Sequence, residues 1–202
     1  MTARRRARGR VATWLAATGL LTIVASGGAA SAGPPDVAVE ATYLYKFAPF
    51  VTWPNSNGPN SNGPNSNGPN GTASGSFNIC VVGDDPFGDQ LDRAVAGQTL
   101  DGRPIQVMRV ETIGPKSDCA IAYLGGSRSE SVAEALKAVR GTPTLTVTDE
   151  GDPPGIIAFA IADGHVRFRV DEVQAQENGL VISSKLLGLA IAVRAAPGQE
   201  EP

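Results

Sequence analysis

The feature that most constrains this chain is the Asp163-Gly164 pair, which lies between two apolar runs and predicts both a turn and a strand register. Asp-Gly favours a two-residue type I′ turn, because both of its central residues tolerate the positive φ that this turn needs. The turn pairs Ala162 with His165, so the residues from about 156 to 170 should form an antiparallel hairpin.

This register sorts the side chains of the hairpin onto two faces. One face is wholly apolar, with the cross-strand pairs Ile157–Val170, Phe159–Phe168 and Ile161–Val166. On the other face, Arg167 and Arg169 each lie opposite an alanine. We expect this basic face to be either an exposed surface whose charges discourage aggregation or a site for an anion or an acidic partner.

Upstream of the hairpin, strand-like and helix-like segments alternate. Strands are expected at 77–82, 105–110, 120–124 and 145–147, and helices at 85–96 and 132–139. Such alternation is typical of a mostly parallel sheet with helices on both faces. The sequence therefore predicts an α/β fold, a three-layer α/β/α arrangement with a mostly parallel sheet plus the antiparallel hairpin.

Downstream of the hairpin, we expect a short helix after Asp171 that ends at Gly179, and an extended segment at 180–182. Ser183 or Ser184 would cap a last helix over 185–194. Residues 186–193 contain no polar side chain, so this helix should be buried on most sides.

The segment before residue 54 has helical periodicity from an N-cap at Asp36 to Val51. One apolar row contains Val37, Ala41, Leu44, Ala48 and Val51. A second row contains the aromatic residues Tyr43, Phe47 and Phe50, and Trp53 follows. The aromatic residues either pack on the domain or form part of a partner-binding surface.

The remaining segments define the domain organisation. Residues 1–32 have the basic, apolar and A-x-A regions of a cleaved export signal. We expect residues 33–54 to form the N-terminal helix and residues 55–76 to form a disordered loop with NSNGP repeats. The main body of the domain should then span residues 77–196, followed by a tail at 197–202. Removing the five arginines of the signal from the 17 Lys and Arg leaves 12 against 20 Asp and Glu, which disfavours nucleic-acid binding.

Few residues suggest chemistry. One His and two Cys exclude a His/Cys metal cluster, and neither G-x-S-x-G nor a nucleotide-binding glycine motif is present, so no catalytic residue or cofactor is expected. Cys80 and Cys119 border neighbouring strands and would be either a disulfide or two buried thiols.

Two acidic loops follow predicted strands. Asp84, Asp85 and Phe87 lie where open α/β sheets bind ligands, and they form a candidate ligand crevice. Asp149, Glu150 and Asp152 could hold a cation together with that loop. Helix capping and solubility are the alternative explanation for both loops.

Several separated motifs resemble the YfiR family of exported bacterial proteins. These motifs are YLYKF at 43–47, FVTWP at 50–54, ICVVGDDPFG at 79–88, GRPI at 102–105, DCAI at 118–121, LTVTD at 145–149 and GLVISSKLL at 179–187. The resemblance implies a periplasmic protein that represses an inner-membrane diguanylate cyclase, or engages another membrane receptor, and that can form a homodimer.

The resemblance also implies that Cys80 and Cys119 form a structural disulfide. No later cysteine pair is present for a second bridge. The candidate partner-binding residues are Tyr43, Phe47, Phe50 and Trp53, with Arg167 and Arg169 as an electrostatic patch. Sensing of a small periplasmic ligand is the alternative function.

Overall fold

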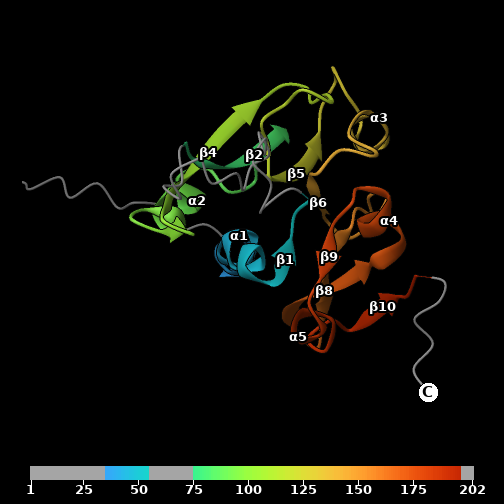
Figure 1. The fold of residues 1–202 in the computed structure, drawn as a ribbon. Coiled ribbons are helices and arrows are strands. Elements are labelled where there is room, and N and C mark those ends of the chain that lie inside the picture. Colours follow the sequence, from blue (N-terminus) through green and yellow to red (C-terminus); the bar gives the residue numbers. More distant parts are fainter. Residues whose placement is uncertain (1–34, 55–74, 197–202) are drawn as a thin grey trace, which may run out of the picture. The chain divides into compact units, whose positions relative to one another are not determined.

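The structure, a computed structural model, describes residues 35–54 and 75–196 (Figure 1). The expected export signal, most of the NSNGP loop and the tail lie outside the described residues. The helices are α1 (Pro35–Phe47), α2 (Asp89–Val95), α3 (Val132–Ala138), α4 (Glu172–Glu177) and α5 (Ser184–Leu187), with a 3-10 turn η1 at Ala48–Phe50.

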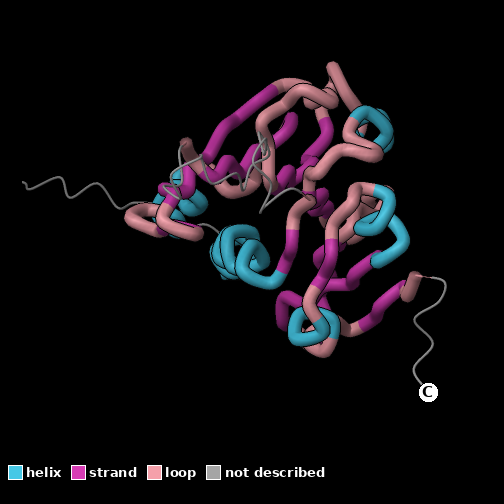
Figure 2. The backbone as a smooth tube through the Cα atoms, in the orientation of Figure 1, coloured by secondary structure: helices cyan, strands magenta, loops and turns pink. Residues whose placement is uncertain are grey.

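The strands form two sheets (Figure 2). The large sheet has the order β10-β8-β7-β6-β5-β2-β4-β3, and a small sheet pairs β1 with β9. Their bounds are β1 Val51–Thr52, β2 Phe77–Gly83, β3 Thr99–Leu100, β4 Arg103–Val110, β5 Ile121–Gly126, β6 Leu145–Thr148, β7 Ile157–Ala162, β8 His165–Asp171, β9 Val181–Ile182 and β10 Ala192–Arg194.

The predicted α/β fold is confirmed. In the large sheet, β2 pairs in parallel with both β4 and β5, and the parallel pairing continues through β6 to β7. The antiparallel pairs of this sheet are β7 with β8 and β3 with β4. Among the described helices, none is long and apolar enough to cross a bilayer.

At β2 and β5, both faces of the large sheet are covered by apolar side chains, because the strand residues alternate between two cores. On β2, Ile79 and Val81 belong to the core beneath α1 and α2. Cys80 and Val82 belong to a second core that contains Val132 of α3. α1 and α2 therefore cover one face of the sheet, and α3 covers the other.

The hairpin has the predicted register. Ala162 pairs with His165, and each pair from there to Ile157–Val170 is as expected. Asp163 and Gly164 have φ of 53° and 70°, which is the backbone that a type I′ turn needs.

The N-terminal helix is shorter than predicted. α1 already includes Asp36 in its first turn, so Asp36 is not the N-cap. The helix ends at Phe47, because Pro49 cannot continue the ladder of hydrogen bonds. Val51 lies in β1 and not in the helix, where it pairs with Ile182 of β9.

The helix expected from residue 85 starts later. α2 begins at Asp89 with Gly88 as its N-cap, so Asp85 and Pro86 lie in the preceding loop. The side chain of Asp85 still caps backbone groups, since it accepts hydrogen bonds from the N–H groups of Phe87 and Gly88 at 2.8 and 3.1 Å.

The prediction of a last helix over 185–194 is wrong. Ser183 caps a single helical turn, α5, which ends at Leu187. The chain then forms β10, parallel to β8 at the edge of the large sheet. Leu189, Ile191 and Val193 are exposed, so the expectation that this segment is buried on most sides is also wrong.

Candidate interaction surfaces

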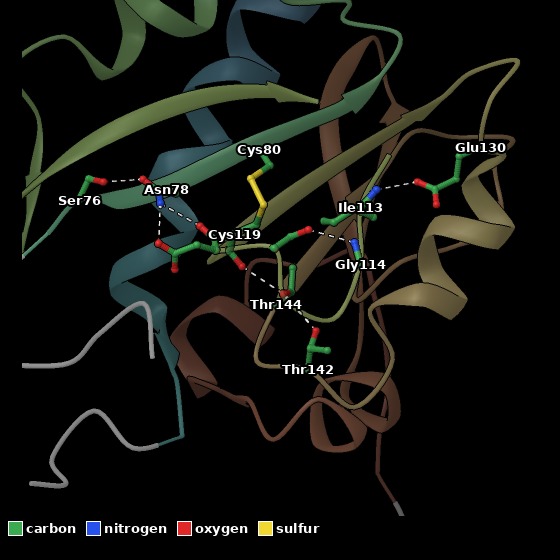
Figure 3. The surroundings of a disulfide bond; sticks show 11 residues. Ser76, Asn78, Cys80, Ile113, Gly114, Cys119, Glu130, Thr142 and Thr144 are labelled. Atoms are coloured by element: carbon green, nitrogen blue, oxygen red, sulfur yellow. Dashed lines mark hydrogen bonds between the residues drawn. A yellow bond between two sulfur atoms is a disulfide. The ribbon is translucent and has the colours of Figure 1, made fainter. Parts of the chain in front are cut away.

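The disulfide joins the middle of β2 to the segment just before β5, and these two strands pair in the large sheet (Figure 3). Cys80 on β2 and Cys119 just before β5 are both buried, with their Cα atoms 5.7 Å apart, which confirms the predicted bridge. Asn78 reinforces the same junction, because its side-chain amide donates to the Asp118 carbonyl at 2.9 Å. Thr144 donates to the Cys119 carbonyl at 3.1 Å and ties β6 to the same place.

The expected ligand crevice beyond β2 is closed by backbone. The Asp84 N–H donates to the Gly126 carbonyl at 2.7 Å. A Cβ on Gly125 would lie 2.0 Å from the Asp84 carbonyl oxygen, and one on Gly83 would lie 2.2 Å from that of Gly126. The two loops therefore touch where an open α/β sheet commonly leaves space for a ligand.

The crevice residues have structural roles instead. Phe87 is buried, and its ring packs edge-on against Tyr123 at 4.6 Å. Asp85 also binds the guanidinium of Arg109 at 2.7 Å, and Asp92 binds the same group at 2.6 Å. These two carboxylates raise the pKa of Arg109, and Arg109 lowers that of Asp92. Arg109 could not be identified from the sequence, because it lies 24 residues from Asp85 and no local pattern indicates that the two side chains meet.

The aromatic row packs mainly on the domain. Tyr43 and Phe47 contact the apolar face of the hairpin, where the Phe47 and Phe168 rings lie 5.2 Å apart. Phe47 and Trp53 are each only 2% exposed, so they are core residues and cannot meet a partner in this conformation. Tyr43 and Phe50 are half-buried.

The two arginines extend from the opposite face of the hairpin. Arg167 and Arg169 lie across from Ala160 and Ala158, whereas Phe168 between them points towards α1. The arginine patch and the aromatic row therefore do not form one surface. Arg169 makes an exposed ion pair with Glu150 at 3.6 Å.

A cavity of about 490 Å³ lies beside the arginine patch. Its walls are the loop 149–155 and the ends of β8 and β10, including Arg169, Asp171 and Arg194. Asp171 is held in place, since it caps α4 and binds Arg194 at 2.8 Å. The acidic loop predicted at Asp149 thus lines a hollow, but no group of three His, Cys, Asp or Glu in 35–54 and 75–196 is placed to hold a metal ion.

An acidic cluster lies between α1 and the carboxyl ends of β5 and β6. The Tyr123 hydroxyl donates to Asp149 Oδ2 at 2.6 Å, while Asp149 Oδ1 is buried without a hydrogen-bond partner in the described structure. Burial and the charges of Asp149 and Asp36 raise the pKa of Glu40 to about 7. Burial, above all, also raises the pKa of Asp149. The sequence feature that could have indicated this cluster is Glu40, an acidic residue one helical turn before the buried Leu44.

Comparison with known proteins agrees with the resemblance. A search of curated proteins found no match to this chain. The family model described as YfiR/HmsC-like matches residues 37–191, which is most of the chain. The matched residues include most of α1, the disulfide and the strands β1 to β9. The chain therefore belongs to the YfiR/HmsC-like family.

Proposed function

We propose that the protein is a non-enzymatic periplasmic regulator that represses an inner-membrane diguanylate cyclase by direct contact. The observation that carries this proposal is the family match over residues 37–191. The basic and apolar segment at the N-terminus supports export. The buried disulfide fits the oxidising compartment that export would reach.

We place the receptor contact on the arginine patch, Arg167 and Arg169. Both side chains are exposed and stand beside alanines, so a partner backbone can approach them closely. Among the described residues, Arg167 makes no ion pair, and the pair of Arg169 with Glu150 is open to water and therefore weak. An acidic segment of the receptor would match this patch and gain charge-assisted hydrogen bonds. Tyr43 and Phe50 remain secondary candidates on the other face.

A second candidate function, small-ligand sensing, is favoured by the cavity next to this patch. The cavity combines apolar Val170 and Val193 with the charged side chains of Arg169 and Arg194. A ligand bound there would contact Arg169 directly and so alter the proposed receptor surface. A rise in melting temperature with a small-molecule panel tests this function, and the rise should be lost in Ala192→Trp, at an exposed position in the cavity wall.

Site-specific photo-cross-linking tests the receptor contact. A photoreactive residue at position 167 should cross-link the protein to a membrane protein that contains a diguanylate cyclase domain. The matched control is position 140, an arginine on the loop after α3 that is also exposed and pairs with Glu177 at 3.5 Å. Equal cross-linking from both positions, or none from 167, would contradict the proposal.

A further inference from the structure

The cavity beside the arginine patch has a floor of small side chains, and the strand register explains why. Arg169 lies across from Ala158 of β7 on one side and from Ala192 of β10 on the other. Because two alanines flank one long side chain on this face of the sheet, a hollow remains next to Arg169. Pro154 and Gly155 complete its apolar lining, and its volume of about 490 Å³ is in the range of small-molecule sites.

The strand wall of this cavity is positively charged. Arg194 follows Ala192 by two residues and therefore lies on the same face of the sheet as Arg169. Arg194 donates from Nη1 to Asp171 at 2.8 Å, and its side chain is 66% exposed. Arg169 pairs with Glu150 at 3.6 Å, a distance too long for a hydrogen bond. Both guanidinium groups therefore keep N–H donors for a carboxylate.

The loop wall of the cavity is negatively charged. Asp149, Glu150 and Asp152 all line it, and the last two are exposed. A simple anion would be repelled by these three carboxylates, and a simple cation would be repelled by Arg169 and Arg194. The two walls together favour a ligand that carries one charge of each sign at separate ends.

We infer that the cavity binds a zwitterionic short peptide of two or three residues. Its amino group would face the acidic loop, and its carboxylate would lie between Arg169 and Arg194. The side chains of the peptide would cover Ala158 and Ala192. This inference rests on the small-ligand function proposed above and names the class of ligand for that cavity.

The volume of the cavity indicates the length of the ligand. A single small amino acid would leave much of the 490 Å³ to water, whereas two or three residues with apolar side chains fill it. Each added residue separates the terminal charges further, by about 3.5 Å in an extended chain. The longer ligand can therefore contact both walls while its side chains lie over the alanines.

Binding of such a peptide would change the arginine patch. Its carboxylate would replace Glu150 as the partner of Arg169. The pair that is lost is exposed and 3.6 Å long, so its loss costs little. Because Arg169 also belongs to the proposed receptor surface, the peptide and the receptor would compete for the same guanidinium group.

Titration of the full chain with the dipeptide valyl-valine, followed by NMR, tests the class of ligand. We expect saturable binding with a dissociation constant on the order of 0.1–1 mM for a ligand of this size. The N-acetylated and C-amidated dipeptides should each bind at least roughly tenfold more weakly, because each loses a charge-assisted hydrogen bond. Equal affinity of the three dipeptides would overturn the inference, as would equal affinity of free valine and valyl-valine.

Variants locate the site. Arg169→Gln should weaken binding of valyl-valine at least roughly tenfold and should reduce the difference between the free and the amidated dipeptide. Arg140→Gln is the matched control, because Arg140 is exposed, pairs with Glu177 at 3.5 Å and does not line this cavity. Ala192→Trp should abolish binding by filling the hollow. Equal affinity of the wild type and Arg169→Gln would overturn the inference, as would an equal loss in Arg140→Gln. Unchanged circular dichroism confirms that each variant is folded.

The receptor contact is tested separately. Cross-linking from position 167 needs no added peptide, so a failure of valyl-valine to bind would overturn this inference and leave the proposed repression in place. The dicarboxylate glutarate and the diamine cadaverine carry charges of one sign only and should not bind. Tighter binding of either one, lost in Ala192→Trp, would keep the small-ligand function and contradict the zwitterion.

Discussion

At the scale of single residues, Glu40 has a clear thermodynamic consequence for the protein. Its pKa of about 7 in the folded protein lies above its ordinary value of 4.5, because the side chain is half-buried near Asp149 and Asp36. Between these two values the folded protein binds more protons than the unfolded chain. The free energy of unfolding should therefore fall as pH rises from about 4.5 to about 7 and stay low above it.

The Glu40→Gln variant tests this linkage. It should stabilise the protein at pH 8 by about 1 kcal/mol. This value is smaller than the full pKa difference would give, because water screens the half-exposed carboxylate. It should also make the melting temperature depend less on pH between pH 5 and pH 8. Glu111→Gln, at an exposed site after β4, is the control and should leave the profile unchanged. A profile that is the same in the wild type and in Glu40→Gln would contradict the prediction.

A substitution at Gly125 tests the close backbone contact beyond β2. A methyl group at this position would lie 2.0 Å from the Asp84 carbonyl oxygen, so Gly125→Ala must separate two backbone segments. We expect a loss of about 1–3 kcal/mol in the free energy of unfolding, measured with urea. Gly114→Ala, where a methyl group meets nothing within 4 Å, should change it little. Similar losses in the two variants would show that the contact at Asp84 is not tight.

At the scale of elements, the hairpin depends on its turn. Gly164 has φ of 70°, a conformation that a β-branched residue tolerates poorly. Gly164→Val should therefore cost about 1–2 kcal/mol, whereas Asp163→Asn should keep the wild-type stability because asparagine also adopts positive φ. Thermal unfolding followed by circular dichroism measures both, and a fully stable Gly164→Val would exclude the type I′ turn.

The disulfide should stabilise the junction of β2 and β5. The double variant Cys80→Ser/Cys119→Ser should lose roughly 3–4 kcal/mol, because the bridge closes a long loop in the unfolded chain. Urea unfolding with and without a reductant measures this loss. The reductant should lower the stability of the wild type and have no effect on the double variant. If the wild type were equally stable with and without the reductant, the bridge would have no stabilising role.

The C-terminal segment shows why one element could not be assigned from the sequence. A continuous apolar run fits a buried helix and a strand equally well, because it carries no polar residues to mark a period. The signal that distinguishes them is weak: the large residues Leu189, Ile191 and Val193 alternate with small ones. The parallel pairing with β8 decides the outcome, and this long-range contact has no local signature.

At the scale of the whole molecule, the sequence predicts the fold better than the site. The mostly parallel sheet follows from the alternating segments and the hairpin register follows from one turn, so both could be predicted. The close approach of Gly125 and Asp84 beside the expected crevice could not be predicted, because it depends on the pairing of β2 with β5. The burial of Trp53 was also not predictable, because it depends on the contact of its ring with Phe77 across the loop.

The proposed function is repression of a membrane cyclase by an exported protein that acts by contact and not by turnover. The most direct test is the concentration of cyclic-di-GMP in cells. Deletion of the gene should raise this concentration, the wild type should restore it, and Arg167→Glu/Arg169→Glu should fail to do so, whereas Arg140→Glu should restore it. An unchanged concentration of cyclic-di-GMP after deletion would contradict the proposed repression.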